Sequence, residues 1–234
     1  MGKSTDLTIT IRMIVIFGLY VLLFACLPLI IYGRSDWWQA WVIAAITILS
    51  ALISRVLVAR NNPDLLTERG RFASVPDAKE WDKKLSPLVG LVGPLLSLLV
   101  CGLDWRFGWS PLLPLWLMLA ALLVLISAHV FAGWALVENR FFSGMARIQA
   151  ERGQVVVDSG PYSIVRHPGY AGAGLAFLTT PVLLGSLWGL IPALGTLVLM
   201  VVRTSLEDRM LQDELPGYWE YAKRTRYRLV PGIW

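Results

Sequence analysis

Charged residues are scarce in this chain, and so are the residues from which metal sites and disulfide frameworks are built. Only 16% of its 234 residues are charged, and it has two cysteines and two histidines. Soluble domains carry about 25% charge, so the composition departs toward membrane proteins. Cys26 and Cys101 lie inside apolar runs and predict no disulfide framework. The few cysteines and histidines show no metal-ligand spacing, and we expect no metal site.

The sequence also lacks the motifs of several common soluble enzymes. It has no P-loop, no strand–glycine-rich loop–helix dinucleotide fingerprint and no nucleophile elbow. It is rich instead in apolar residues, which make up 56% of the chain. The net charge of +5 does not indicate a nucleic-acid partner, because the basic residues collect beside apolar runs, where they meet lipid headgroups. Membrane lipids are therefore expected partners.

Four apolar runs are long enough to cross a bilayer as helices, which takes about 20 residues each. They are Ile9–Ile31, Trp38–Val58, Leu85–Leu103 and Leu112–Val137. A fifth stretch, Tyr170–Val202, would extend about 50 Å as one helix, against about 30 Å of hydrocarbon. Pro181, Gly185 and Pro192 interrupt it. The predicted fold is an all-α integral membrane protein, with four transmembrane helices and a C-terminal helical hairpin that together give five to six membrane segments.

The basic residues predict an orientation. All of the 21 lysines and arginines except Arg34 and Arg106 lie in or beside the amino terminus, the 59–84 loop, the 138–168 segment or the carboxyl tail. Lysine and arginine are enriched in cytoplasmic loops, so both termini are expected in the cytoplasm. A hairpin in the fifth stretch keeps the basic tail on that side. The compact loops and the lack of an organelle signal favour a bacterial inner membrane.

Polar residues concentrate after position 137, which divides the chain into transmembrane helices (1–137) and a candidate catalytic region (138–234). Arg166 and His167 directly precede the hairpin, at a helix start that favours anionic groups. Arg203 and Glu207 are four residues apart and share a helix face. Simpler interpretations exist: interface anchors for the first pair, and an ordinary ion pair for the second. His129, on an apolar helix, is expected to be a packing residue.

An ordered series of motifs makes the second region more specific. Gly160-Pro161-Tyr162 is followed by Arg166-His167-Pro168-Gly169-Tyr170, the apolar hairpin, Glu207-Asp208-x-x-Leu211 and Tyr218-x-x-Tyr221. From about Asn139 onward, the chain resembles the isoprenylcysteine carboxyl methyltransferases and the wider group of membrane phospholipid-type methyltransferases. The sequence departs from that pattern at Asp208, where the family usually has a second glutamate, and at Gln154, where it often has histidine.

The resemblance implies a methyltransferase that uses S-adenosylmethionine, held in a cytoplasmic-side pocket, to methylate a lipophilic small-molecule or lipidated acceptor. It implies catalytic roles for Arg203 and Glu207, with Arg203 also near the acceptor. Carried over position by position, the cofactor contacts are Gln149, Gln154, Val155, Val156, Val157, Tyr162, Arg166, His167, Pro168, Gly169, Tyr170 and Glu207. A carboxylate acceptor, as in an isoprenylcysteine, suits an arginine fork.

Three alternatives stay open at this point. A phospholipid amine N-methyltransferase shares the same motif series. A membrane reductase of the sterol type has a similar carboxyl-terminal architecture but binds NADPH. A small transporter or scaffold is disfavoured, because the polar residues gather at one cytoplasmic mouth rather than along a path through the midplane, where transport sites usually lie.

Overall fold

The computed structural model describes residues 2–70 and 77–234, and within them every regular element is helical. The elements are α1 (Gly2–Tyr32), α2 (Trp38–Asn61), α3 (Pro63–Gly70), α4 (Glu80–Pro87), η2 (Leu88–Val92), α5 (Gly93–Phe107), α6 (Leu115–Glu138), η3 (Ala150–Arg152), η4 (Gly160–Ser163), α7 (Pro168–Leu183), α8 (Leu190–Glu214) and α9 (Tyr218–Arg224). The predicted all-α class is confirmed. The 59–84 loop contains α3 and the start of α4, and Arg71 within it lies outside the described residues.

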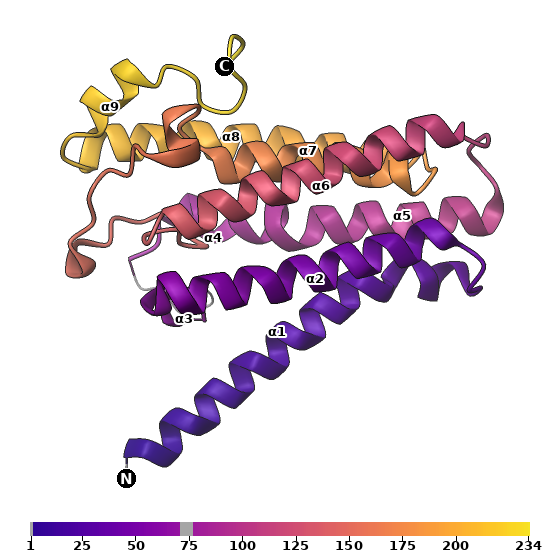
Figure 1. Ribbon diagram of the computed structural model, residues 1–234, viewed down its shortest axis with the longest axis horizontal. Helices are drawn as coiled ribbons and strands as arrows, with labels where there is room; N and C mark the ends of the chain where they lie inside the picture. Colours follow the sequence, from indigo (N-terminus) through magenta and orange to yellow (C-terminus); the bar gives the residue numbers. More distant parts are fainter. Residues whose placement is uncertain (1, 71–76) are drawn as a thin grey trace.

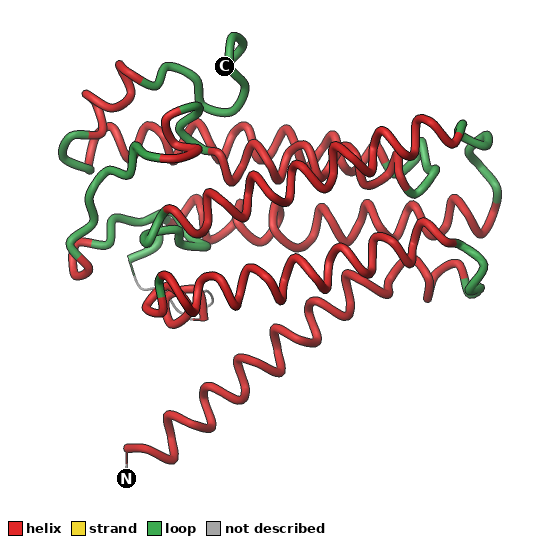
Figure 2. The backbone as a smooth tube through the Cα atoms, in the orientation of Figure 1, coloured by secondary structure: helices red, strands yellow, loops and turns green. Residues whose placement is uncertain are grey.

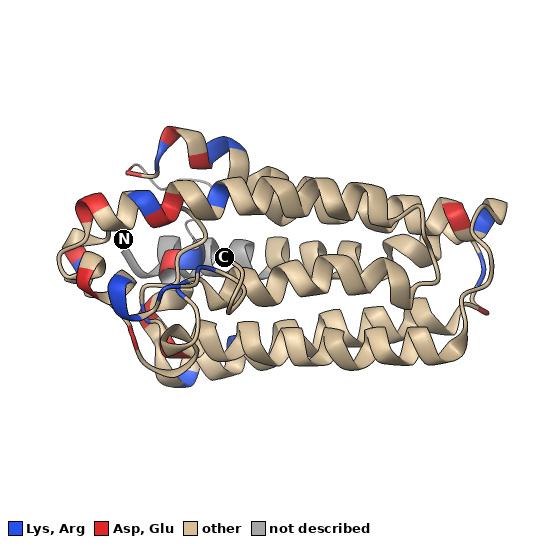
Figure 3. Ribbon diagram, turned by 90° about the horizontal axis from the view of Figure 1, so that it is seen from above, with Lys and Arg blue, Asp and Glu red and all other residues tan. Residues whose placement is uncertain are grey.

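The long helices run back and forth between two ends of a bundle (Figures 1 and 2). One end carries both chain termini, the connection from α6 to α7, and α9; we call it the polar end. The loops that follow α1, α5 and α7 lie at the opposite end. Acidic and basic residues gather at the polar end, while the middle of the bundle has almost none (Figure 3). This distribution is that of a membrane bundle with its charge concentrated on one side.

Five helical rods are long and apolar enough to cross a membrane: α1, α2, the continuous rod from α4 to α5, α6 and α8. The predicted hairpin is confirmed as α7 and α8, which turn at residues 184–189. With 16 residues, α7 is about 24 Å long, shorter than the roughly 30 Å of hydrocarbon. It begins at the polar end and α8 returns there, so the chain enters and leaves the hairpin at the same end, as the basic residues predict.

A buried carboxylate fastens the hairpin turn to α5. Asp104 accepts hydrogen bonds from the Ser110 hydroxyl at 2.6 Å, the Ser110 amide at 2.7 Å and the Ser186 hydroxyl at 2.5 Å. The indole of Trp105 donates to the Leu184 carbonyl. A buried carboxylate without donors costs several kcal/mol, and these hydroxyls supply them. These hydrogen bonds fix the position of the turn between α7 and α8.

Helices α6 and α7 approach each other closely at Gly172. A Cβ atom added there would lie 2.6 Å from the Ala128 carbonyl oxygen and 2.9 Å from the Ala132 Cβ. Because the first of these is a backbone atom, it cannot rotate aside as a side chain would. Only glycine allows this approach. The contact holds the start of α7 beside the end of α6, where the polar residues lie.

We therefore expect Gly172→Ala to lower the free energy of unfolding by about 1–3 kcal/mol, the usual cost of overpacking. Thermal unfolding of the purified protein in detergent measures this. Gly133→Ala is the matched control on α6, because a Cβ there meets nothing within 4 Å. The control should unfold at or above the temperature of the parent protein, since alanine has the higher helix propensity. Equal melting temperatures for both variants would contradict the close contact.

Candidate functional site

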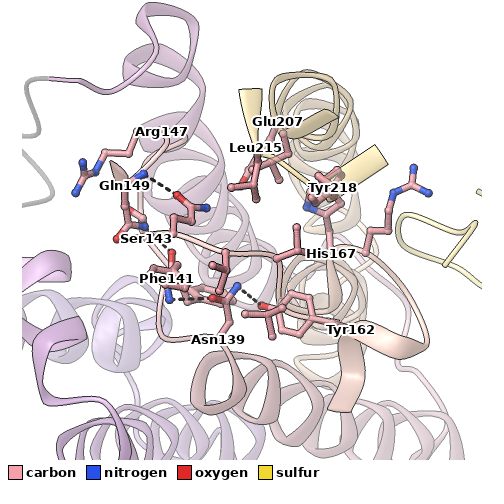
Figure 4. A pocket seen from close by; sticks show the side chains of 18 of the residues that line it. Asn139, Phe141, Ser143, Arg147, Gln149, Tyr162, His167, Glu207, Leu215 and Tyr218 are labelled. Carbon is pink, nitrogen blue, oxygen red and sulfur yellow. Dashed lines mark hydrogen bonds between the residues drawn. The ribbon is translucent and has the colours of Figure 1, made fainter. Parts of the chain in front are cut away.

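A pocket lies at the polar end, between the end of α6, the start of α7 and the end of α8. Its lining leaves about 750 Å³ of empty space, which includes open solvent. It is lined by Asn139, Phe141, Phe142, Ser143, Met145, Arg147, Gln149, Gln154, Val155, Val156, Val157, Tyr162, Arg166, His167, Gly169, Tyr170, Glu207, Leu211, Leu215, Tyr218 and Tyr221. Apart from Arg147, the side chains labelled in Figure 4 converge from separate chain segments.

Nearly all residues that the motif series predicts as cofactor contacts meet in this pocket. Its walls include Gln149, Gln154, Val155, Val156, Val157, Tyr162, Arg166, His167, Gly169, Tyr170 and Glu207. Pro168 and Arg203 do not line it. Residues 155–157, whose three valines predict a short extended piece, lie outside any helix or strand. The geometry thus gathers residues spread over almost 60 positions, and their roles stay predictions.

Pro168 does not line the pocket itself, but it begins α7, one of the helices that form the pocket. It occupies the first position of the helix, where its fixed φ suits the helix and its missing N–H costs nothing. The next residue, Gly169, lies so close to the Phe142 ring that an added Cβ would come within 2.6 Å of it. Both Gly169 and Phe142 line the pocket. Because Gly169 has no side chain, the start of α7 can lie directly against the Phe142 ring.

Glu207 and Arg203 share a face of α8 but do not form an ion pair. The Tyr170 hydroxyl donates to Glu207 at 2.5 Å. The Arg203 guanidinium lies 5.1 Å from the centre of the Tyr170 ring and donates to Asp82 from Nε at 2.6 Å and Nη2 at 2.9 Å. The ordinary ion pair considered from the sequence is therefore wrong. Glu207 faces the pocket, while Arg203 lies behind Tyr170.

Asp208 is the structural hub beneath the pocket, and it has no exposed surface. It accepts hydrogen bonds from Arg166 Nε at 2.7 Å and Nη2 at 2.8 Å, and from Arg228 Nε at 2.8 Å. Gln212 Nε2 adds a bond at 2.8 Å and the Tyr218 hydroxyl another at 3.1 Å. A buried charge is tolerated only with such pairing. The adjacent acids thus differ in position: Glu207 lines the pocket and Asp208 supports it.

The carboxyl tail runs beside the start of α7 and is held by Arg166. The Nη1 atom of Arg166 donates to the carbonyls of Thr225 at 2.9 Å and Arg226 at 2.8 Å. The backbone amide of Arg166 donates to the Tyr227 carbonyl at 2.9 Å. Burial alone lowers the pKa of Arg166, but the hydrogen bond and charge of Asp208 outweigh it and raise this pKa above its usual value. The guanidinium therefore stays charged. Arg166 is a structural clamp as well as a pocket residue.

Tyrosine hydroxyls in the pocket stay protonated. Burial raises the pKa of Tyr218 far above its usual value, and the charge of Asp208 raises it further. Burial likewise raises the pKa of Tyr162, whose hydroxyl accepts from Asn139 Nδ2 at 3.2 Å (Figure 4). His167 Nε2 lies 3.3 Å from Asp208, and its ring stacks on that of Tyr170 with 5.7 Å between the ring centres. These phenols therefore act as neutral donors and aromatic surfaces.

The wall formed by residues 141–149 is held in place from outside the pocket. Asp82 of α4, which is fully buried, accepts from the Ala146 amide at 2.6 Å while it pairs with Arg203. Glu68 of α3 receives two hydrogen bonds from Arg147, from Nε and Nη2, both at 3.0 Å. Figure 4 shows the Arg147 side chain directed away from the other labelled residues. Two acids from the first half of the chain thus position a wall in the second half.

Several pocket residues were missed in the sequence analysis. They are Asn139, Phe141, Phe142, Ser143, Met145, Arg147, Leu211, Leu215, Tyr218 and Tyr221. Leu211, Tyr218 and Tyr221 belong to the motif series but were given no role. Their spacing offered a usable signal, because Leu211 follows Glu207 by one helical turn. Nothing in the sequence distinguishes Phe141 and Phe142 from membrane-facing phenylalanines.

The pocket combines one carboxylate, one imidazole, aromatic faces and an apolar stretch, the valines at 155–157. Its two guanidinium groups, Arg147 and Arg166, are already paired with Glu68 and Asp208. Such a set suits a ligand that has hydroxyl or amino groups, a flat ring and a positive charge. Within residues 2–70 and 77–234, no group of three or more histidine, cysteine, aspartate or glutamate side chains is arranged to hold a metal ion.

Residues 113–215 match a protein-family model described as phospholipid methyltransferase. The matched segment contains α6, α7 and α8, and every pocket residue except Tyr218 and Tyr221. The resemblance to membrane methyltransferases that the motif series indicated is confirmed. No curated protein matches the chain.

The buried pair of Asp82 and Arg203 predicts a large effect of a small change. Asp82→Asn keeps the size of the side chain but leaves the Arg203 charge buried without its partner, so we expect a loss of about 3–5 kcal/mol in the free energy of unfolding. The control is Glu80→Gln on the same helix, which removes an exposed pair with Lys83 and should change nothing measurable. Thermal unfolding in detergent compares them, and equal stabilities would refute the role of Asp82.

Proposed function

We propose that this chain, whose residues 113–215 match the phospholipid methyltransferase family model, is an integral-membrane enzyme that transfers a methyl group from S-adenosylmethionine to a lipophilic acceptor. The observation that carries the proposal is the pocket at the polar end, in which the matched segment supplies nearly all of the lining. The matched family gives no support to the membrane reductase considered from the sequence.

The residues of the pocket fit the methyl donor group by group. S-adenosylmethionine, when bound, supplies a methyl group on a positively charged sulfur. Glu207 is suited to accept a hydrogen bond from a hydroxyl or amino group, and it is already fixed by Tyr170. The faces of Tyr162 and Tyr170 suit a flat base or a cation. His167, at the start of α7, is suited to a carboxylate.

The remaining task of the protein is to orient the two reactants. Methyl transfer is a one-step displacement, so holding donor and acceptor in line supplies much of the rate enhancement. The Asp208 hub and the Asp82–Arg203 pair hold opposite sides of the pocket by buried ion pairs. A pocket with walls fixed in this way loses little entropy when its ligands bind.

Arg203 remains our proposed contact for the acceptor. Its Nε and Nη2 atoms pair with Asp82, while Nη1 makes no hydrogen bond to any described residue. An isoprenylcysteine-like carboxylate would therefore receive one hydrogen bond from Nη1, where an unpaired fork would give two. A phospholipid amine is the second candidate acceptor, favoured by the description of the matched family.

The proposed location is the bacterial inner membrane, with the polar end and both termini in the cytoplasm. The gathering of charge at that end supports this orientation (Figure 3). A cytoplasmic pocket gives direct access to a soluble, charged methyl donor. The apolar bundle beside it gives access to lipophilic acceptors.

Calorimetry with S-adenosylhomocysteine tests the proposal. We expect the protein in detergent to bind it and not to bind NADPH. Glu207→Gln should weaken binding about 10- to 100-fold, because hydrogen bonds to charged groups contribute about 1.5–3 kcal/mol and 1.4 kcal/mol is tenfold. His167→Ala should also weaken it. Glu220→Gln, an equal charge change at an exposed site of α9, is the control. Full affinity in the Glu207 and His167 variants would remove the assignment.

A second measurement identifies the acceptor. Incubation with labelled S-adenosylmethionine and lipid acceptors of two kinds, isoprenylcysteine-type carboxylates and phosphatidylethanolamine, should label the carboxylate class if Arg203 contacts it. Arg203→Lys should then raise KM for the acceptor more than it changes the affinity for S-adenosylhomocysteine. Labelling of phosphatidylethanolamine alone would show that the acceptor is an amine.

A further inference from the structure

The carboxyl tail ends in a closed hook, residues 228–234. The backbone amides of residues 228–230 all donate to the main-chain oxygen of Trp234, at 2.9, 3.0 and 3.1 Å. The amide of Trp234 donates back to the Val230 carbonyl at 3.1 Å. Gly232 has a φ of +82°, which glycine adopts readily, and it turns the chain inside the hook. These bonds close the end of the chain on itself and give the hook a defined backbone shape.

The hook directs aliphatic side chains outward. Val230 is 45% exposed and Ile233 is 81% exposed. Val198 is 62% exposed on α8, a helix apolar enough to span the membrane, so Ile233 is more exposed than an aliphatic side chain in a lipid-facing position. Arg226 and Tyr227, directly before the hook, are exposed as well. An aliphatic tip that follows a basic and an aromatic residue is typical of elements in the membrane interface.

The hook begins near the level at which α8 leaves the apolar part of the bundle. Arg228 donates from Nε to Asp208 of α8 at 2.8 Å. Val202, a half-exposed aliphatic residue, precedes Asp208 by six residues, which is about 9 Å along the helix. Each headgroup layer adds about 5–8 Å to the hydrocarbon core. Arg228 therefore reaches α8 close to the depth of the headgroups.

The hook lies on the flank of the bundle. In Figures 1 and 3 the carboxyl terminus lies over the long helices rather than beyond the polar end. Helix α8 continues for six residues past Asp208, to Glu214, so the hook leaves α8 before the helix ends. The flank of a membrane bundle is the surface that lipids surround. The tip is thus placed where a bilayer, and not only water, meets the protein.

We propose that the hook inserts Val230 and Ile233 into the interface of the bilayer and thereby fastens the carboxyl tail to the membrane. Removing these two side chains from water supplies the apolar contribution. Arg226, beside the hook, supplies attraction to anionic headgroups. The hook lies outside the segment matched by the family, residues 113–215, and the inference does not depend on the proposed methyl transfer.

The pocket gives this attachment a structural consequence. The amides of Arg166 and His167, at the start of α7, donate to the carbonyls of Tyr227 and Arg228, both at 2.9 Å. Any opening that separates the tail from α7 breaks these bonds. If such an opening also withdraws the hook from the bilayer, lipid contact at the tip makes it less frequent. The bilayer therefore helps to hold the tail against the pocket.

A nitroxide label at the tip measures its depth. Ile233→Cys is made in a Cys26→Ala background, since Cys101 is buried, and is reconstituted in nanodiscs of phosphatidylcholine and phosphatidylglycerol. Collision with oxygen, which concentrates in lipid, is compared with collision with a water-soluble nickel chelate. Labels at Ala150→Cys, exposed in η3, and Val198→Cys are the water and lipid references.

We expect the ratio of oxygen to nickel collisions at position 233 to be at least three times the ratio at position 150, as it should be at position 198. A smaller ratio at position 233 would place the tip in water and overturn the insertion. Protection of the label from both reagents would show that a protein surface covers the tip, and would overturn it as well.

Hydrogen–deuterium exchange in the same nanodiscs tests the consequence for the tail. We expect Ile233→Ser to speed exchange of the Arg166 and His167 amides at least threefold, because the tail separates from α7 more often. Leu112→Ser is the control, a similar change at an exposed position of the opposite end, and should leave these amides unchanged. Unaltered exchange in the middle of α7 reports an intact bundle. Equal exchange of the two amides in Ile233→Ser and the parent protein would refute the attachment.

Discussion

The pocket depends on one buried carboxylate. Asp208, without exposed surface, is shared by Arg166 from the start of α7 and Arg228 from the carboxyl tail. Because an unpaired charge in such a place is prohibitively costly, the partners have to come together for the site to form. The hub thereby joins the end of α8 to the start of α7 and to the carboxyl tail. It explains how polar side chains are held in fixed positions at the end of a membrane protein.

A second set of contacts ties the two halves of the chain. Asp82 and Glu68 come from short helices in the first half, and they hold the loop that forms one wall of the pocket. The family match covers residues 113–215 and so includes the wall but not its supports. A description confined to the matched segment would therefore omit the acids that give the wall its shape. The first half is part of the site's construction.

The sequence predicted the helices well, but it did not predict the buried ion pairs that hold the pocket in place. Apolar length and the breakers near Pro181 predicted the spans and the hairpin, because the bilayer constrains length directly. The motif series predicted which residues between Gln149 and Glu207 lie close together. Chains that share the spacing of such motifs also share the arrangement of these residues in the fold. The partner of Arg203 could not be predicted, since Asp82 lies 121 positions earlier in a loop that looks merely solvated. Contacts between buried charges have no local pattern.

The pairing of the tail with α7 has a consequence for synthesis. The amides of Arg166 and His167 donate to the carbonyls of Tyr227 and Arg228, about 60 residues further along. Translation delivers the earlier segment first, and the membrane helices insert as they emerge. The floor of the pocket is therefore incomplete until residue 228 has left the ribosome. A nascent chain passes through a stage in which its helices are already in the bilayer and its pocket is not yet complete.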